Sequence, residues 1–274
     1  MKAECAICPR RCLLESGQTG FCGARKNTGG AITCENYGQI TSMALDPIEK
    51  KPLRHFYPGS FILSVGSCGC NMRCPFCQNH RISTPAEKPD AVYVSPEALV
   101  EKAESLKSRG NIGIAYTYNE PLIGYEYVTD CARLAQKKGL KNVLVTNGFI
   151  NEGPLSALLP FIDAANIDLK CFNDEYYRKL GGGLDAVKRT IETAAQSIHV
   201  EVTTLIIPGE NDSEGEMDML SAWLSAINSD IPLHVSRFFP NYKYADKAPA
   251  PVEHIYSLAG TARKNLRRVY TGNC

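Results

Sequence analysis

The chain has 274 residues, 44% of them hydrophobic, and its 30 Lys and Arg residues nearly balance 29 Asp and Glu residues, which leaves a net charge of +1. This length can bury a sizeable core, and the balanced charge argues against a nucleic-acid or membrane partner. The sequence shows neither an apolar signal region nor a membrane-length span. We therefore expect a cytoplasmic protein, whose clustered cysteines bind metals or clusters rather than form disulfides.

Residues 1–45 are rich in cysteine, and we expect them to form a metal-binding knuckle in front of a main domain over residues 46–274. The pattern C-x2-C-x3-C-x9-C gives four candidate ligands: Cys5, Cys8, Cys12 and Cys22. Four cysteines with little apolar periodicity around them indicate a segment held together by metal rather than by a core. Cysteine spacing does not separate zinc from an auxiliary iron–sulfur cluster, and unligated thiols are the alternative to both.

From residue 61 on, short β-rich runs alternate with segments of helical periodicity. Six runs rich in β-branched and aromatic residues are predicted to be strands, at 61–66, 112–118, 142–148, 164–170, 199–207 and 232–239. Apolar stripes predict helices around 99–106, 217–227 and 255–266. The alternation predicts an α/β fold with a parallel sheet, either a partial barrel or a doubly wound sheet. In both folds, ligands bind at the carboxyl ends of the strands.

Polar residues follow the predicted strands. The second, third and fourth strands lead to three pairs: Asn119 with Glu120, Thr146 with Asn147, and Asp168 with Lys170. Taken singly, each pair could be a turn or a surface ion pair. Because the ends of parallel strands meet at one edge of a sheet, the pairs together predict a single site.

The first strand leads into a loop that carries Cys70, Cys74 and Cys77 at C-x3-C-x2-C spacing. An iron–sulfur cube takes four thiolates, one for each iron. Three thiolates from one loop leave the fourth iron open to an exogenous ligand, and an open position is typical of catalytic metal sites. Zinc is the alternative, but the loop has no nearby fourth ligand for a closed tetrahedral site.

This loop, with Phe76 before its last cysteine, resembles the signature of the radical S-adenosylmethionine (SAM) superfamily, C-x3-C-x-aromatic-C after the first strand of a partial (β/α)6 TIM-like barrel. The resemblance implies that fold and a [4Fe-4S] cluster on Cys70, Cys74 and Cys77, with SAM bound to the open iron. It also implies an oxidoreductase in which an electron from the cluster cleaves SAM, and the 5′-deoxyadenosyl radical abstracts hydrogen from a substrate.

Within that superfamily, the chain resembles the glycyl-radical-enzyme activases similar to pyruvate formate-lyase activating enzyme. It is most similar to the AmmeMemoRadiSam system radical SAM enzyme group, with which we also associate residues 46–60. In "YTYNEPL", the resemblance implies that Glu120 accepts a hydrogen bond from the SAM amino group, while Asn119 replaces a glycine.

Two further stretches resemble the activases. "NIDLK" implies that Asp168 and Lys170 lie near the methionine carboxylate of SAM, together with a monovalent cation. "VTNG" matches at Thr146 and Asn147, but Val145 replaces the aspartate expected to bind that cation.

Three functional hypotheses follow. The first is an activase that installs a glycyl radical on a protein partner, with flavodoxin or ferredoxin as electron donor. The second is radical modification of a small molecule, peptide or RNA within an AmmeMemoRadiSam system, and the third is a non-catalytic iron–sulfur or zinc redox sensor. Glu120, Asp168 and Lys170 argue against the sensor, which needs no SAM pocket, and the near-neutral charge disfavours RNA. We favour the activase-like hypothesis and leave the substrate open.

Overall fold

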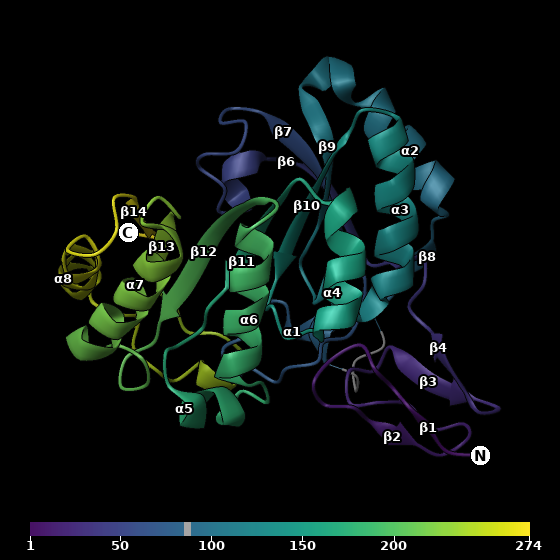
Figure 1. Ribbon diagram of the computed structural model, residues 1–274, viewed down its shortest axis with the longest axis horizontal. Coiled ribbons are helices and arrows are strands. Elements are labelled where there is room, and N and C mark those ends of the chain that lie inside the picture. The colour runs from purple at the N-terminus through teal and green to yellow at the C-terminus, as the bar shows by residue number, and fades with distance from the viewer. Residues whose placement is uncertain (85–88) are drawn as a thin grey trace.

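The computed structural model describes residues 1–84 and 89–274. Its centre is one eight-stranded sheet, in which β6 lies at one edge and β14 at the other (Figure 1). In sheet order the strands are β6 (Ser42–Pro47), β7 (Phe61–Gly66), β9 (Asn111–Tyr116), β10 (Lys141–Thr146), β11 (Ala164–Asp168), β12 (His199–Ile206), β13 (Leu233–Arg237) and β14 (Val269–Gly272). The strands from β7 to β14 pair in parallel, whereas β6 runs antiparallel to β7.

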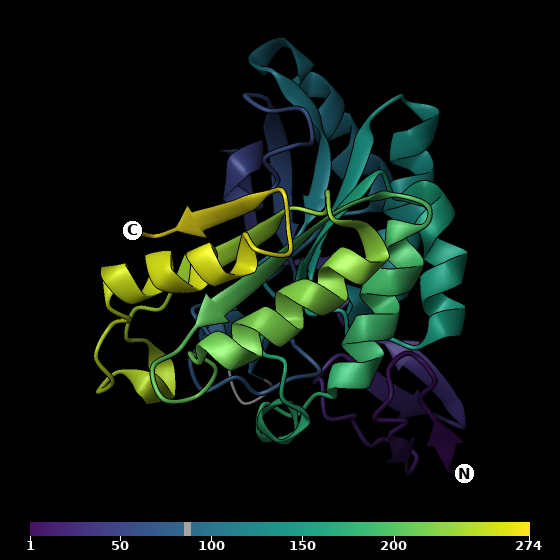
Figure 2. The same ribbon diagram turned by 60° about the vertical axis from the view of Figure 1, so that its left-hand side comes forward.

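Helices alternate with the parallel strands, and the longer ones cover the outer side of the sheet (Figures 1 and 2). They are α1 (His80–Ser83), α2 (Pro96–Ser105), α3 (Tyr125–Lys137), α4 (Glu152–Leu158), α5 (Asp174–Lys179), α6 (Leu184–Ala195), α7 (Glu214–Asn228) and α8 (Val252–Ala262). Side chains cap two of them in the usual way, since Ser95 accepts from the Ala98 N–H before α2 and Ser213 accepts from the Glu216 N–H before α7.

The predicted fold class is confirmed, and all six predicted strands are present. Five of them end one or two residues earlier than expected, and two of these five end at Tyr116 and Thr146. In both cases the chain turns through a residue with left-handed backbone, Tyr118 (φ +70°) and Gly148 (φ +68°), which an extended strand does not contain. The three predicted helices correspond to α2, α7 and α8.

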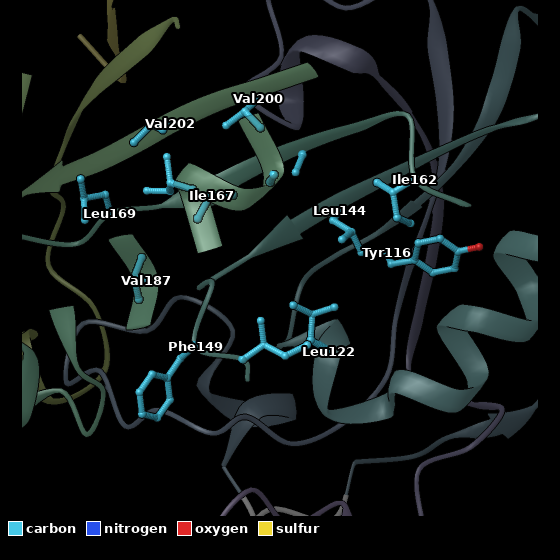
Figure 3. Packing of buried hydrophobic residues seen from close by; sticks show 14 of the residues in the cluster. Tyr116, Leu122, Leu144, Phe149, Ile162, Ile167, Leu169, Val187, Val200 and Val202 are labelled. Atoms are coloured by element: carbon cyan, nitrogen blue, oxygen red, sulfur yellow. The ribbon is translucent and has the colours of Figure 1, made fainter. Parts of the chain in front are cut away.

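The main core lies between the sheet and the outer helices, and Figure 3 shows part of it. Buried side chains from successive strands, among them Tyr116, Leu144, Ile167 and Val202, pack against the helices and the loops that follow the strands. None of the helices within residues 1–84 and 89–274 is long and apolar enough to cross a bilayer.

A second, smaller core closes the inside of the curved sheet near the amino ends of its strands. The segment 48–60 supplies Ile48, Leu53 and Phe56, which pack against inward-facing side chains of four strands: Ile62, Ala115, Val143 and Ala164. We call the segment 48–60 the barrel floor. It lies within residues 46–60, the stretch associated above with the AmmeMemoRadiSam group.

The residues before β6 form small antiparallel pairs rather than a layer of the main sheet. β1 (Ala3–Glu4) pairs with β2 (Leu13–Leu14), and β3 (Arg25–Thr28) pairs with β4 (Ala31–Cys34). Figures 1 and 2 show them beside the ends of α3 and α4. The expected domain boundary at residue 45 stays a prediction, and β6, which pairs with β7, begins at Ser42.

One buried carboxylate fastens the barrel floor to the sheet. Glu201 on β12 is fully buried, and it accepts hydrogen bonds from the backbone N–H groups of Arg54 (3.0 Å) and His55 (2.7 Å). The Nε2 atoms of His199 and His234 lie 2.9 and 2.6 Å from its two oxygens. Burial alone would raise the pKa of Glu201, but these four contacts outweigh it and lower the pKa from 4.5 to about 2.

We predict that Glu201→Gln lowers the free energy of unfolding by about 2 to 3 kcal/mol, the scale of hydrogen bonds to a charged group. Because the folded-state pKa is depressed, the carboxylate stabilises the wild type fully above pH 4.5, and that stabilisation is lost as the pH falls toward about 2. Urea unfolding across this pH range checks both statements, with the exposed Glu101→Gln as control. Equal stability of the two variants at neutral pH would contradict the prediction.

Candidate active site

A cavity of about 360 Å³ lies toward the carboxyl ends of the parallel strands from β7 to β13. It is lined by every residue that the sequence assigned to the catalytic cluster or to SAM: Cys70, Cys74, Phe76, Cys77, Asn119, Glu120, Thr146, Asn147, Asp168 and Lys170. These residues come from four separate segments of the chain, each of which follows or ends a strand. One cavity therefore brings the predicted site residues together, while the role of each residue stays a prediction.

The three thiols face this cavity from one loop, and the loop offers hydrogen-bond donors to sulfur. The Cys70 Sγ accepts from the Met72 N–H at 3.4 Å and from the Asn147 side-chain amide at 3.6 Å. Burial raises the pKa of the Cys70 thiol, and it raises that of Cys74 to about 11 although Lys170 opposes it. Burial disfavours the charged thiolate form of a cysteine, whereas nearby positive charge, such as that of a bound iron ion, favours it. This donor set fits an iron–sulfur cluster.

Glu120 is buried at the centre of the loops after β9 and β10. Its Oε1 accepts from the Thr146 hydroxyl (2.7 Å) and the Leu122 N–H (3.0 Å), and its Oε2 accepts from the Asn147 N–H (2.8 Å). Burial raises the pKa of Glu120 to about 7 against the effect of these donors. Glu120 thus holds Thr146 and Asn147 in place while it lines the cavity.

Asn119 and Asn147 connect neighbouring loops through their side chains. The Asn119 side chain accepts from the Ser67 N–H and donates to the Gly69 carbonyl, both at 3.0 Å. Asn119, which stands where the family motif has a glycine, therefore holds the loop before Cys70 through side-chain hydrogen bonds. Asn147 donates at 2.9 Å to the side-chain oxygen of Asn71, the residue that follows Cys70.

Asp168 and Lys170 form an ion pair on the wall of the cavity, with a Nζ–Oδ2 distance of 2.9 Å. Burial would lower the pKa of Lys170, but the Asp168 carboxylate and the Cys74 thiol outweigh it and raise that pKa well above its usual range. The Lys170 ammonium also lies 6.0 Å from the centre of the Phe76 ring. A cation thus stays fixed beside the cysteine loop.

Three residues to which the sequence assigned no role meet beside the cavity: Asp46, Lys51 and Tyr118. Lys51 comes from the barrel floor and is buried, and the Asp46 carboxylate accepts from its ammonium (2.9 Å) and from the Tyr118 hydroxyl (2.8 Å). Lys51 and Tyr118 line the cavity, and the ammonium lies 4.7 Å from the Tyr118 ring centre. The rule that site residues follow strands could not identify Lys51, because it precedes the first parallel strand.

The left-handed backbone of Tyr118 depends on a neighbouring glycine. A Cβ on Gly66 would lie 2.9 Å from the Cβ of Tyr118, closer than such atoms approach in proteins. Gly66 at the end of β7 therefore makes room for Tyr118, which then directs its ring toward Lys51.

The four N-terminal cysteines of the predicted knuckle line a separate, small cavity of about 10 Å³. Burial raises the pKa of the Cys8 thiol to about 11 and also raises that of Cys22. Within residues 1–84 and 89–274, no three His, Cys, Asp or Glu side chains are close enough to bind one metal ion. Ligation by these four thiols, like the monovalent cation beside Asp168, stays a prediction.

Residues 64–220, from β7 into α7, match the family described as the Radical SAM superfamily. An uncharacterized protein of Methanocaldococcus jannaschii is 40% identical over 99% of this chain and 81% of its own length.

The chain belongs to the radical SAM superfamily.

Membership implies a [4Fe-4S] cluster and SAM as cofactors, and radical chemistry as the reaction class.

Two other relatives are more distant. The pyruvate formate-lyase 1-activating enzyme of Escherichia coli is 29% identical over 53% of this chain, which spans 61% of that enzyme. A probable GTP 3′,8-cyclase of Archaeoglobus fulgidus is 27% identical over 58% of this chain and 52% of its own length.

Solved structures agree on the fold. Streptococcus suis SuiB bound to S-adenosylmethionine matches with a TM-score of 0.57 and 14% identity, over 75% of this chain and 48% of SuiB. A domain of pyruvate-formate lyase-activating enzyme from Bacteroides vulgatus matches with a TM-score of 0.50 and 13% identity, over 59% of this chain and 99% of that domain. At these identities the likeness concerns the fold alone.

We predict that Glu120→Gln weakens SAM binding by about 10- to 100-fold. The change removes the carboxylate charge, and the new amide NH2 group meets N–H and O–H donors that bind a carboxylate oxygen in the wild type. Equilibrium binding of SAM to the reconstituted protein under anaerobic conditions measures the effect. Glu175→Gln, an exposed change on α5, is the matched control and should bind SAM like the wild type. Unchanged affinity in Glu120→Gln would contradict a role for this carboxylate.

Proposed function

We propose that this protein is an activating-enzyme-like radical SAM oxidoreductase that abstracts hydrogen from a protein partner. The observation that carries the proposal is the convergence of three loop thiols, a buried glutamate and a fixed Asp–Lys pair on one cavity. In it, Cys70, Cys74 and Cys77 would hold a [4Fe-4S] cluster. When bound, the cluster supplies the electron for reductive cleavage of SAM, and so generates a radical that can abstract hydrogen.

The residues of the chain would bind and orient SAM. Glu120 supplies a buried negative charge for an amino group, and the Lys170 ammonium supplies a positive charge for a carboxylate. SAM carries both groups on its methionine portion. Because Thr146 and Asn147 are fixed by Glu120, they would present their polar groups in one arrangement.

The apolar side of the cavity would keep water from the reactive centre. Phe76 and Met72 are buried and line it, and the barrel floor closes the inside of the sheet beneath. Exclusion of water protects a reactive species from side reactions.

Two arguments support a protein as the substrate. The first is the similarity to the Escherichia coli activating enzyme. The second is size: a cavity of about 360 Å³ is near the lower end of the range for one small ligand. SAM and the cluster would fill it, so the hydrogen donor would have to reach in from the mouth, as a loop of a larger molecule can.

A small-molecule substrate is the second candidate, favoured by the buried Lys51 beside the cavity. The ammonium of Lys51, held by Asp46 and Tyr118, could bind an anionic group of such a substrate. The similarity to a probable GTP 3′,8-cyclase supports the same candidate. The cytoplasmic location and a flavodoxin or ferredoxin electron donor remain predictions.

We predict that Cys74→Ala abolishes formation of 5′-deoxyadenosine from SAM, because two thiols from the loop would not retain the cluster. The assay is anaerobic reconstitution with iron and sulfide, addition of SAM and dithionite, and chromatography of the products. Cys274→Ala, at the exposed end of the chain, is the control and should react like the wild type. Wild-type product from Cys74→Ala would contradict the assignment. A wild type that binds the cluster but forms no product would favour the redox sensor.

The substrate class can be tested with the same product. We expect SAM cleavage to increase when the dialysed macromolecular fraction of a cell extract is added, and to return to its basal rate after protease treatment of that fraction. Stimulation only by the small-molecule filtrate would contradict a protein substrate and support the second candidate.

A further inference from the structure

We propose that Cys5, Cys8, Cys12 and Cys22 hold a second [4Fe-4S] cluster, at a site that shares a wall with the loop of Cys70, Cys74 and Cys77. The four thiols surround one cavity, and three of them are buried. This site is separate from the SAM cavity, so the proposal stands independently of the reaction proposed above.

The interior of the N-terminal segment consists largely of sulfur. The buried apolar residues before β5 (Gln39–Ile40) are Cys5, Cys8, Leu14, Cys22 and Ala24. Two small hairpins around three thiols and two aliphatic side chains bury too little apolar surface to fold alone. Small segments of this kind are usually stabilised by a bound metal, whose binding energy becomes folding energy.

The polar groups around the cavity suit a negatively charged centre. Arg10 and Arg25 both line it. The guanidinium of Arg25 is buried and pairs with both oxygens of Glu126 at 2.6 Å, yet its Nε has no hydrogen-bond partner in the part of the chain that the structure describes. A buried donor without a partner costs about 1–3 kcal/mol. A thiolate or sulfide of a bound cluster would supply the acceptor.

The separation of the four thiols favours a cluster over a single zinc ion. Tetrahedral zinc draws four sulfurs to about 2.3 Å from one point, which leaves no room for another atom between them. Within the described ranges, residues 1–84 and 89–274, no three His, Cys, Asp or Glu side chains are close enough to bind one metal ion, so the four thiols stand further apart than tetrahedral zinc requires. Each thiolate of a cluster binds a different iron, so the sulfurs stay further apart.

The shared wall consists of backbone contacts with the catalytic loop. The Cys22 carbonyl accepts from the Cys70 N–H at 3.1 Å, and a Cβ on Gly69 would collide with that carbonyl oxygen. Arg10 donates to the Asn71 carbonyl at 3.0 Å, and the Asn71 side chain lines the N-terminal cavity. The ligand set of one centre is therefore one hydrogen bond away from that of the other.

The test counts metal in the protein when the catalytic cysteines are absent. A Cys70→Ala, Cys74→Ala, Cys77→Ala triple variant, reconstituted anaerobically, should retain about four irons of the about eight in the wild type. The electron paramagnetic resonance signal of its reduced cluster should not change on addition of SAM, because all four irons have protein ligands. Loss of all iron from the triple variant, or a signal that SAM alters, would overturn the proposal.

The complementary variant is Cys5→Ser with Cys22→Ser, which should drop the iron content from about eight to about four. Cys34→Ser is the matched control, because Cys34 lies in the same segment but donates to the Asn36 side chain at 3.1 Å, and it should keep about eight. Should the double variant fail to fold, the wild type still decides: about four irons with one zinc would overturn the proposal. SAM cleavage is measured separately, so failure of the proposed reaction leaves the metal count readable.

Discussion

The parallel pairing of β7, β9, β10 and β11 is the constraint on which the site depends. Because these neighbouring strands run in one direction, the residues that follow them meet at one edge. Glu120 then joins two of the loops, since it comes after β9 and binds the residues at the end of β10. The site is thus assembled from short segments whose positions the sheet determines, and each needs only local hydrogen bonds to hold its side chains.

Much of this arrangement could be predicted from the sequence. The strands are runs of β-branched residues, and the polar pairs after them are local features that a parallel sheet must bring together. Strand β6 and the barrel floor could not be read in this way. Their positions depend on tertiary contacts, such as Glu201 with the backbone of Arg54 and His55, which leave no periodic pattern in either segment. Lys51 was missed for the same reason.

The ends of the strands show a second limit on what can be predicted from the sequence. The sequence shows where β-branched residues stop, but the chain leaves the sheet where its backbone turns. Tyr118 turns in the left-handed region although it is not glycine, and it can do so because Gly66 on the neighbouring strand has no side chain. The cause lies 52 positions away in the sequence, so no local rule could have found it.

The barrel floor also determines how molecules can enter. Ile48, Leu53 and Phe56 fill the inside of the sheet at the amino ends of the strands, so the cavity is closed at that end. A molecule that binds deep in the cavity would be covered by one that binds nearer the carboxyl ends of the strands. The packing of these three apolar side chains thus favours a kinetic order of binding and release when two ligands share the cavity.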